Sequence, residues 1–99
     1  MNPLCICFHG TTKENSEVIM RDGFKKGTFF ATHLDDAIEF GGDHIFEVMF
    51  VRERVPQKWQ FTIRRKLHPN RIVRNYSFNQ EVLYDNEELR HKIFNSNER

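Results

Sequence analysis

Short runs of β-branched and aromatic residues recur along this chain, and they constrain its fold more than any other feature of the sequence. Glycine, proline and charged residues bound each run, a pattern that predicts a strand. The longest run, residues 44–51, is almost wholly apolar and predicts a central strand. The strands predicted in this way cover residues 4–8, 28–32, 44–51, 59–63, 71–74 and 81–84.

Two helices are predicted between the first three runs. Each begins with a capping box, in which a threonine is followed three residues later by an acidic residue; the boxes are Thr11–Glu14 and Thr32–Asp35. The first helix ends at Gly23 and the second at Gly41–Gly42, where glycine favours a left-handed C-terminal residue. A third box, Asp85–Glu88, predicts a short terminal helix.

The order strand, helix, strand, helix, followed by several strands, predicts an α+β fold. Two or three short helices would flank a mostly antiparallel sheet or a pair of small sheets. The chain has 99 residues, of which 38% are hydrophobic and ten are phenylalanine, so one compact core is within its reach. We expect a single domain over residues 1–94 and a frayed tail over 95–99.

Charge is unevenly distributed, although the whole chain carries a formal net charge of only +1. Residues 1–50 have four basic and eight acidic groups, residues 51–75 have eight and one, and residues 76–99 have three and five. The middle segment is therefore a basic block. Such a block suits a phosphate group, of a dinucleotide or of a nucleic acid, but it is also typical of solvated strand faces.

The N-terminal residues show no signal-peptide pattern and no apolar run could span a bilayer, so we expect a cytoplasmic protein. Cys5 and Cys7 alternate on one predicted strand, an arrangement that does not suit a relaxed disulfide, and we expect reduced thiols. His9 continues that alternation, but neighbours on one strand face lie nearly 7 Å apart. This spacing is too wide for three ligands of one zinc ion, and we expect no metal site.

Several separated motifs occur together in a specific order. Phe-His-Gly-Thr (8–11) is followed by Asp-Gly-Phe (22–24), Gly-Thr-Phe-Phe-Ala-Thr (27–32), a helix ending near Phe40, and Asn-Gln-Glu-Val-Leu-Tyr (79–84). This series resembles the poly(ADP-ribose)-polymerase-like branch of the ADP-ribosyltransferase superfamily. The resemblance spans roughly residues 4 to 85 and implies an ADP-ribosyltransferase-like fold with a split, mostly antiparallel sheet.

The resemblance also implies how NAD would be held. Phe29 and Phe40 occupy the two family positions that sandwich the flat, cationic nicotinamide ring. Gly10, which has no side chain, would let its backbone N–H and C=O pair with the carboxamide. His9 would hydrogen-bond the adenosine ribose, and Thr11 the nicotinamide ribose.

A carboxylate near the ribose would stabilise the oxocarbenium-like sugar formed when nicotinamide leaves. Glu81 is the candidate, by similarity to toxin-like relatives with the acid directly before Val-Leu, and Asn79 lies two residues earlier. The polymerase-like register places Gln80 in that slot instead, and alternate residues of a strand face opposite ways. The family tyrosine is Phe29 here, which keeps stacking but loses a hydroxyl.

The resemblance therefore implies a mono-ADP-ribosyltransferase that uses NAD as co-substrate and transfers ADP-ribose to an acceptor. A protein acceptor is favoured over a nucleic acid, and we expect a monomer that does not bind membranes. If water is the acceptor, the chain is an NAD glycohydrolase. Two other hypotheses are a non-catalytic module that binds NAD, ADP-ribose or a protein, and an RNA-end-processing transferase on a related fold, suggested by the basic block.

Overall fold

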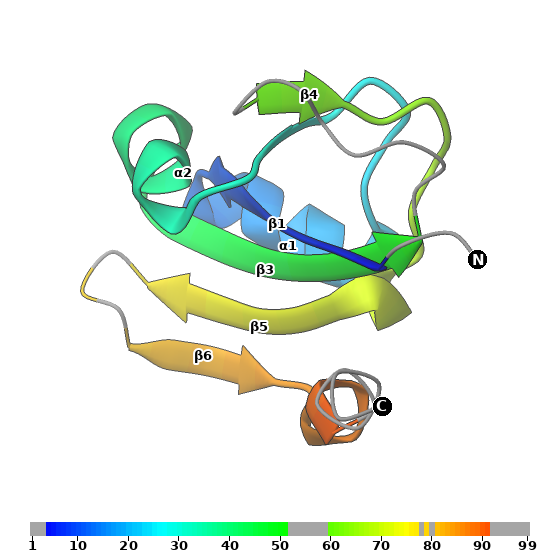
Figure 1. Ribbon diagram of the computed structural model, residues 1–99. Coiled ribbons are helices and arrows are strands. Elements are labelled where there is room, and N and C mark those ends of the chain that lie inside the picture. Colours follow the sequence, from blue (N-terminus) through cyan, green and yellow to red (C-terminus); the bar gives the residue numbers. More distant parts are fainter. Residues whose placement is uncertain (1–3, 52–59, 78, 80, 92–99) are drawn as a thin grey trace.

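The computed structural model describes residues 4–51, 60–77, 79 and 81–91. They form a sheet flanked by short helices (Figure 1). The elements in chain order are β1 (Leu4–Thr11), α1 (Lys13–Asp22), β2 (Phe29–Ala31), α2 (Leu34–Gly41), β3 (His44–Val51), β4 (Gln60–Thr62), the 3-10 turn η1 (Pro69–Arg71), β5 (Ile72–Ser77) and β6 (Val82–Asp85). Residues 87–91 are also helical.

The described strands form one six-stranded sheet in the order β4-β2-β1-β3-β5-β6, and every neighbouring pair is antiparallel. The predicted α+β class and antiparallel sheet are confirmed. The predicted split of the sheet is not observed among these strands. β1 and β3 pair along their full length, from Leu4↔Val51 to Thr11↔His44, and so join β4 and β2 on one side to β5 and β6 on the other. The link between β1 and β2 is much narrower, with the single residue pair Phe8↔Ala31.

The first helix begins one residue later than the capping box predicted. Thr11 is the last residue of β1 and is buried, so it is unavailable as a cap. Thr12 takes that place, and its hydroxyl accepts a hydrogen bond from the Asn15 backbone N–H at 3.2 Å. Gly23 ends the helix with φ +86°, as predicted, and a Cβ there would collide with the Leu67 carbonyl.

The other two predicted caps are also shifted by one residue. His33, not Thr32, precedes α2, and its side chain makes no capping hydrogen bond. Asn86, not Asp85, caps the helical turn at 87–91, through a 3.1 Å hydrogen bond from the Leu89 N–H to its side chain. Asp85 belongs to β6, where two arginines hold its carboxylate.

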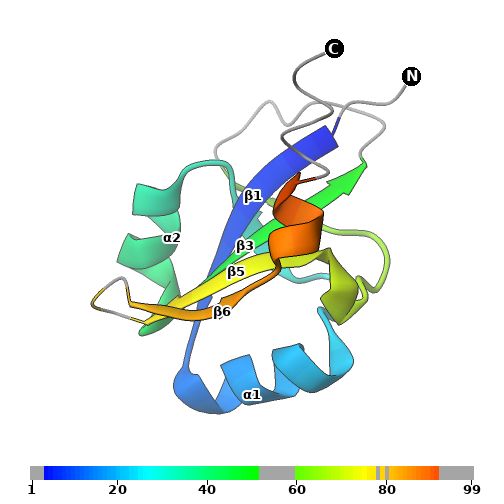
Figure 2. The ribbon, with the colours of Figure 1, turned by 90° about the horizontal axis from the view of Figure 1, so that it is seen from below.

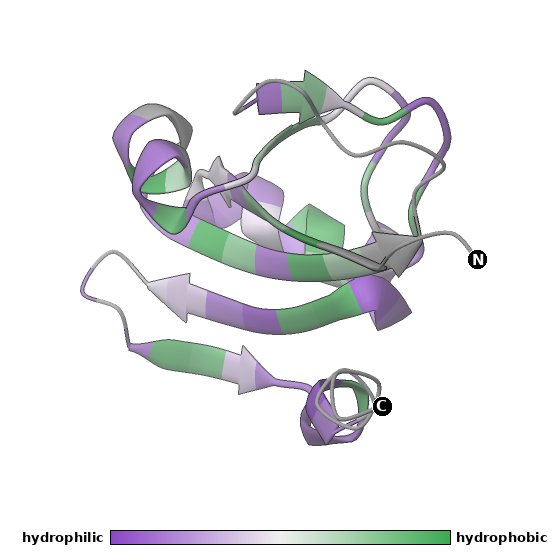
Figure 3. Cartoon of the chain, in the orientation of Figure 1, coloured by the Kyte–Doolittle hydropathy of each residue, from purple (hydrophilic) through white to green (hydrophobic). Residues whose placement is uncertain are grey.

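The helices cover both faces of the sheet (Figure 2), and most of β3, a central strand, is coloured hydrophobic in Figure 3. α1 packs on one face, and α2 with the helical turn at 87–91 packs on the other. The core under α1 is the larger and comprises Cys7, Ile19, Phe24, Phe30, Phe46, Val48, Ile63, Leu67 and Ile72. Under α2 lie Ala31, Ala37 and Ile45, with Phe8, Leu34, Ile38 and Tyr76 packed against them.

Phe24 closes the core under α1 and connects two loops. Its backbone exchanges hydrogen bonds of 2.8 and 2.9 Å with Leu67. Its ring is 1% exposed and packs edge-on against Phe30 and Phe46, with ring centroids 5.0 and 5.6 Å away. The predicted tail, residues 95–99, lies outside the described residues.

We expect Phe24→Ala to lower the free energy of unfolding by about 3–5 kcal/mol, because it empties a packed ring site. Phe29→Ala is the matched control: this ring is 57% exposed, so its removal should change stability by no more than about 0.5 kcal/mol. Urea unfolding followed by circular dichroism measures both. Equal losses for the two variants would contradict the assignment of Phe24 to the core.

Candidate functional site

Two segments converge on the end of β1, where the sequence places His9, Gly10 and Thr11. The first is β2: the ring Nδ1 of His9 lies 2.7 Å from the carbonyl oxygen of Phe29. The second is the end of α2, where Gly42 has φ +119° and packs so closely that a Cβ would lie 2.8 Å from the Thr11 carbonyl oxygen. The chain segments that carry Phe29 and Phe40 therefore meet at the same strand end.

The contacts of His9 determine which of its ring nitrogens carries the proton. A carbonyl oxygen can only accept, so Nδ1 must donate to it, and in the neutral ring Nε2 is then left with a lone pair. The ring packs against Phe24 and Phe30, with centroids 5.5 and 5.6 Å away. Burial lowers the pKa of His9, and the hydrogen bond to Phe29 opposes that shift. At neutral pH the site thus presents a neutral imidazole whose Nε2 is a hydrogen-bond acceptor.

The two aromatic residues predicted to sandwich nicotinamide lie on elements that pack together. Phe29 alternates with buried Phe30 along β2, so its ring lies on the sheet face that α2 covers, as does Ala31. Its exposure makes it available to a flat ligand. Phe40 belongs to the last turn of α2, but its side chain lies outside the described part of the chain, and the two-ring slot stays a prediction.

Glu81 lies at the same end of the sheet as Thr11, but it is next to β5 and β6, whereas Thr11 ends β1. Thr11 pairs with His44, His44 pairs with Ser77, and the Ser77 N–H donates to the Glu81 carbonyl at 2.9 Å. Three strand spacings of about 4.8 Å place the two backbones roughly 14 Å apart. The structure brings the His9 imidazole to the Phe29 backbone carbonyl, although the His9 ring lies on the sheet face of α1 and the Phe29 ring on the face of α2. Glu81 is left with β3 and β5 between it and β1.

The remaining predicted residues lie around the connection between β5 and β6. Asn79 is exposed in this connection, as is Glu81, whose N–H donates to the Ser77 hydroxyl at 3.2 Å. Gln80 lies outside the described residues, so the choice between Gln80 and Glu81 stays open. Cys7, weighed as a metal ligand, is fully buried in the core under α1, with its Sγ 3.8 Å from the Val48 carbonyl oxygen.

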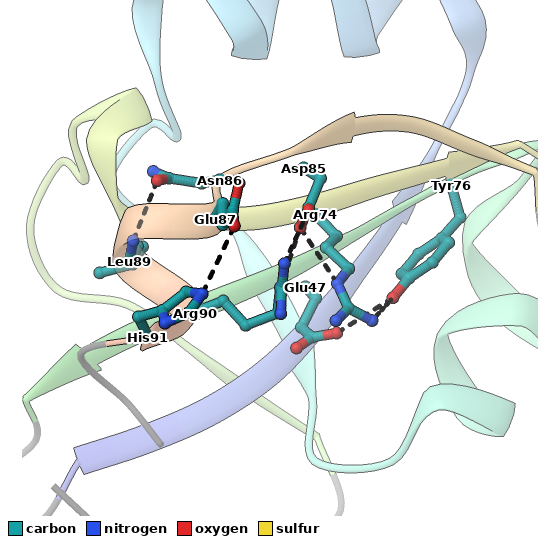
Figure 4. A network of polar contacts seen from close by, with 9 residues as sticks. All are labelled: Glu47, Arg74, Tyr76, Asp85, Asn86, Glu87, Leu89, Arg90 and His91. Carbon is teal, nitrogen blue, oxygen red and sulfur yellow. Dashed lines mark hydrogen bonds and ion pairs between the residues drawn. The ribbon is translucent and has the colours of Figure 1, made fainter. Parts of the chain in front are cut away.

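Figure 4 shows a polar network that the motif comparison did not single out. The Asp85 carboxylate binds Arg74 at 3.3 Å and Arg90 at 3.0 Å, and both interactions lower its pKa, chiefly that with Arg90. Arg74 also donates to the Tyr76 hydroxyl at 3.0 Å, and that hydroxyl donates to Glu47 at 3.3 Å. The two carboxylates, Asp85 and Glu47, balance the charges of the two arginines. Arg90 of the terminal helical turn is linked through Asp85 to Arg74 of β5, so the network connects that turn to the sheet.

Two buried polar atoms among the described residues have no hydrogen-bond partner: His44 Nδ1 and Asn75 Oδ1. Both residues share the sheet face of α1, because His44 pairs with Ser77 and Asn75 pairs with Phe46 of the core under α1. Alternation along the chain carried no signal for Asn75, because a register shift in β5 puts Val73, two positions earlier, on the other face with Met49 and Leu89. Asn75 was also missed because the predicted strand stopped at residue 74, whereas β5 continues to Ser77.

Comparison of the chain with protein-family models, with curated proteins and with solved structures finds no match. The suggestion of a family therefore rests on the sequence motifs alone. Within the described ranges, none of the helices has the length and apolarity needed to cross a membrane.

The assignment of His9 predicts how stability depends on pH. Because the folded pKa is lower than the value of about 6.5 in the unfolded chain, the unfolded state binds the proton first as pH falls. Stability should decline as pH drops through the unfolded value and level off below the folded one. Urea titrations at a series of pH values measure this slope, and His9→Gln should reduce it.

Nitrogen NMR gives an independent readout of the same residue. We expect His9 to titrate at a lower pH in the folded chain than in the urea-unfolded chain, and to carry its proton on Nδ1 at neutral pH. A proton on Nε2 would contradict the hydrogen bond to Phe29, and a His9 pKa raised by folding would contradict the dominant effect of burial.

Proposed function

We propose that this chain binds NAD at the end of β1 and acts as a mono-ADP-ribosyltransferase in the cytoplasm, with a protein as the acceptor. The observation that carries the proposal is the convergence of β2 and the end of α2 on residues 9–11, with His9 held in one tautomer. This arrangement offers a hydrogen-bond acceptor on the α1 face, an exposed aromatic ring on the α2 face and a close backbone approach at the end of β1.

Each feature suits one part of the dinucleotide. The Nε2 lone pair of His9 can accept a hydrogen bond from a ribose hydroxyl, which a protonated imidazole could not do. Phe29 offers an exposed face on which the nicotinamide cation can stack. The Gly10 backbone can approach the carboxamide because no side chain intervenes. Thr11 is buried at the strand end, so its share in binding would come from its backbone rather than from an exposed hydroxyl.

The proposed reaction breaks the bond between the anomeric carbon and nicotinamide. Nicotinamide leaves with the electron pair of that bond as a neutral molecule, and the sugar becomes oxocarbenium-like. The acceptor nucleophile then bonds to the anomeric carbon and loses a proton. In this scheme the Glu81 carboxylate stabilises the developing positive charge and binds the ribose 2′-hydroxyl. Water in place of the protein acceptor would give NAD hydrolysis.

Removing the exposed ring should weaken NAD binding. We expect Phe29→Ala to raise the Kd for NAD about ten-fold, the equivalent of about 1.4 kcal/mol of lost stacking. Val82→Ala is the matched control, since that side chain is 51% exposed but lies on β6. Calorimetry with purified protein measures both. Equal affinity of the wild type and Phe29→Ala for NAD would contradict the proposed ring site.

The position of Glu81 favours a second candidate, a module that binds NAD or ADP-ribose without turnover. With β3 and β5 between Glu81 and β1, the acid is not in place beside the ring site. Under the transferase proposal, Glu81→Gln abolishes nicotinamide release from labelled NAD and leaves binding largely intact. Under the hypothesis of a non-catalytic module, the wild type binds NAD and releases no nicotinamide. Absence of both binding and release would contradict both.

A further inference from the structure

β6 is an edge strand whose side chains are exposed on both of its faces. Val82, Leu83 and Tyr84 are 51%, 49% and 36% exposed, and Figure 3 colours the first part of β6 as hydrophobic. An edge strand also presents unpaired backbone N–H and C=O groups along its outer side, which makes it a template for another strand. We propose that β6 pairs with β4 of a second copy of this chain, so that the sheets of successive copies join edge to edge.

The sheet topology provides the right strand direction for this pairing. Among the strands of the described ranges, β4 and β6 are the two edges of the sheet (Figure 1). All five neighbouring pairs are antiparallel, so directions alternate across the six strands and the two edge strands run opposite ways. A second copy placed beside β6 in the same orientation therefore presents β4 antiparallel to it. The joined sheets would continue one antiparallel pattern.

The charges at the two edges are complementary in this arrangement. Glu81 is exposed immediately before β6, and three exposed basic residues follow β4: Arg64, Arg65 and Lys66. Antiparallel pairing sets the start of one strand against the end of the other, so Glu81 would lie beside Arg64 and Arg65 of the next copy. Opposite charges across a strand pair are stabilising.

The same charges disfavour the symmetric alternative. In an antiparallel β6–β6 pair, Glu81 of one copy would lie near Asp85 of the other, whose carboxylate Arg74 and Arg90 already bind, so Glu81 would gain no basic partner from the opposing strand. A β4–β6 contact joins two different surfaces and leaves a free β4 edge and a free β6 edge on every assembly, so it does not stop at two copies. Because β4 has three residues and β6 has four, each contact is short and the association should be weak and concentration-dependent.

Sedimentation equilibrium of the purified chain at low and high salt tests the proposal. We expect the weight-average mass to rise with concentration beyond that of a dimer at low salt, and to fall towards the monomer at high salt as the charges are screened. A monomer at all concentrations in low salt would overturn the proposal. A mass that levels off at that of a dimer would also overturn it, since it would indicate a closed symmetric pair.

Charge-reversal variants test whether β4 and β6 form the contact between copies. Glu81→Lys alone, and the double variant Arg64→Glu with Arg65→Glu alone, should each need roughly five-fold or higher concentration to associate, because each sets like charges against one another. Mixing the two variants in equal amounts restores opposite charges at every contact and should restore association. Val18→Lys is the control, as this side chain is 36% exposed on α1, away from both edges.

Circular dichroism of each variant confirms that it is folded before sedimentation. Recovery on mixing cannot come from unfolded chains, so it separates a lost contact from a lost fold. Association that is unchanged in both charge variants, or that does not return when they are mixed, would exclude the β4–β6 contact.

Discussion

The full-length pairing of β1 with β3 is the constraint on which the rest of the molecule depends. Eight residue pairs fix its register, and with it which side chains face α1 and which face α2. Cys7 and Phe46 are thereby directed under α1, while Phe8 and Ile45 are directed under α2. A shift of one residue would exchange these two sets, exposing one core and burying Glu47 under α1, so the register is strongly specified by hydrophobic burial.

The pairing of β1 with β3 also determines which segments lie at the end of β1. Its last residues lie beside the start of β3, which requires α2 to end close by and makes Gly42 necessary against the Thr11 carbonyl. Phe29 is brought to His9 by a different route, because β2 pairs with β1 at a single position and the imidazole then reaches the Phe29 carbonyl. Packing of α2 and hydrogen bonding of His9 thus assemble the candidate site from three elements.

Much of this architecture could be predicted from residue patterns. β3 has the predicted bounds, the helices end at the predicted glycines or beside them, and the antiparallel α+β class is as expected. Cap positions were wrong by one residue because Thr11 and Asp85 extend their strands, a consequence of long-range pairing that a local capping pattern does not contain. Strand order is equally non-local. The sequence offered no means of predicting that β3 and β5 would separate Glu81 from β1.

The single residue pair between β1 and β2 has a consequence for local opening of the sheet. β2 and β4 are joined to each other by three pairs but to the central strands by one, so little backbone hydrogen bonding opposes their movement as a unit. Opening at this seam breaks few backbone hydrogen bonds, but it withdraws Phe30 and Ile63 from the core under α1, so side-chain burial rather than strand pairing sets its free-energy cost. The same local opening would uncover the imidazole of His9, whose ring packs against Phe24 and Phe30.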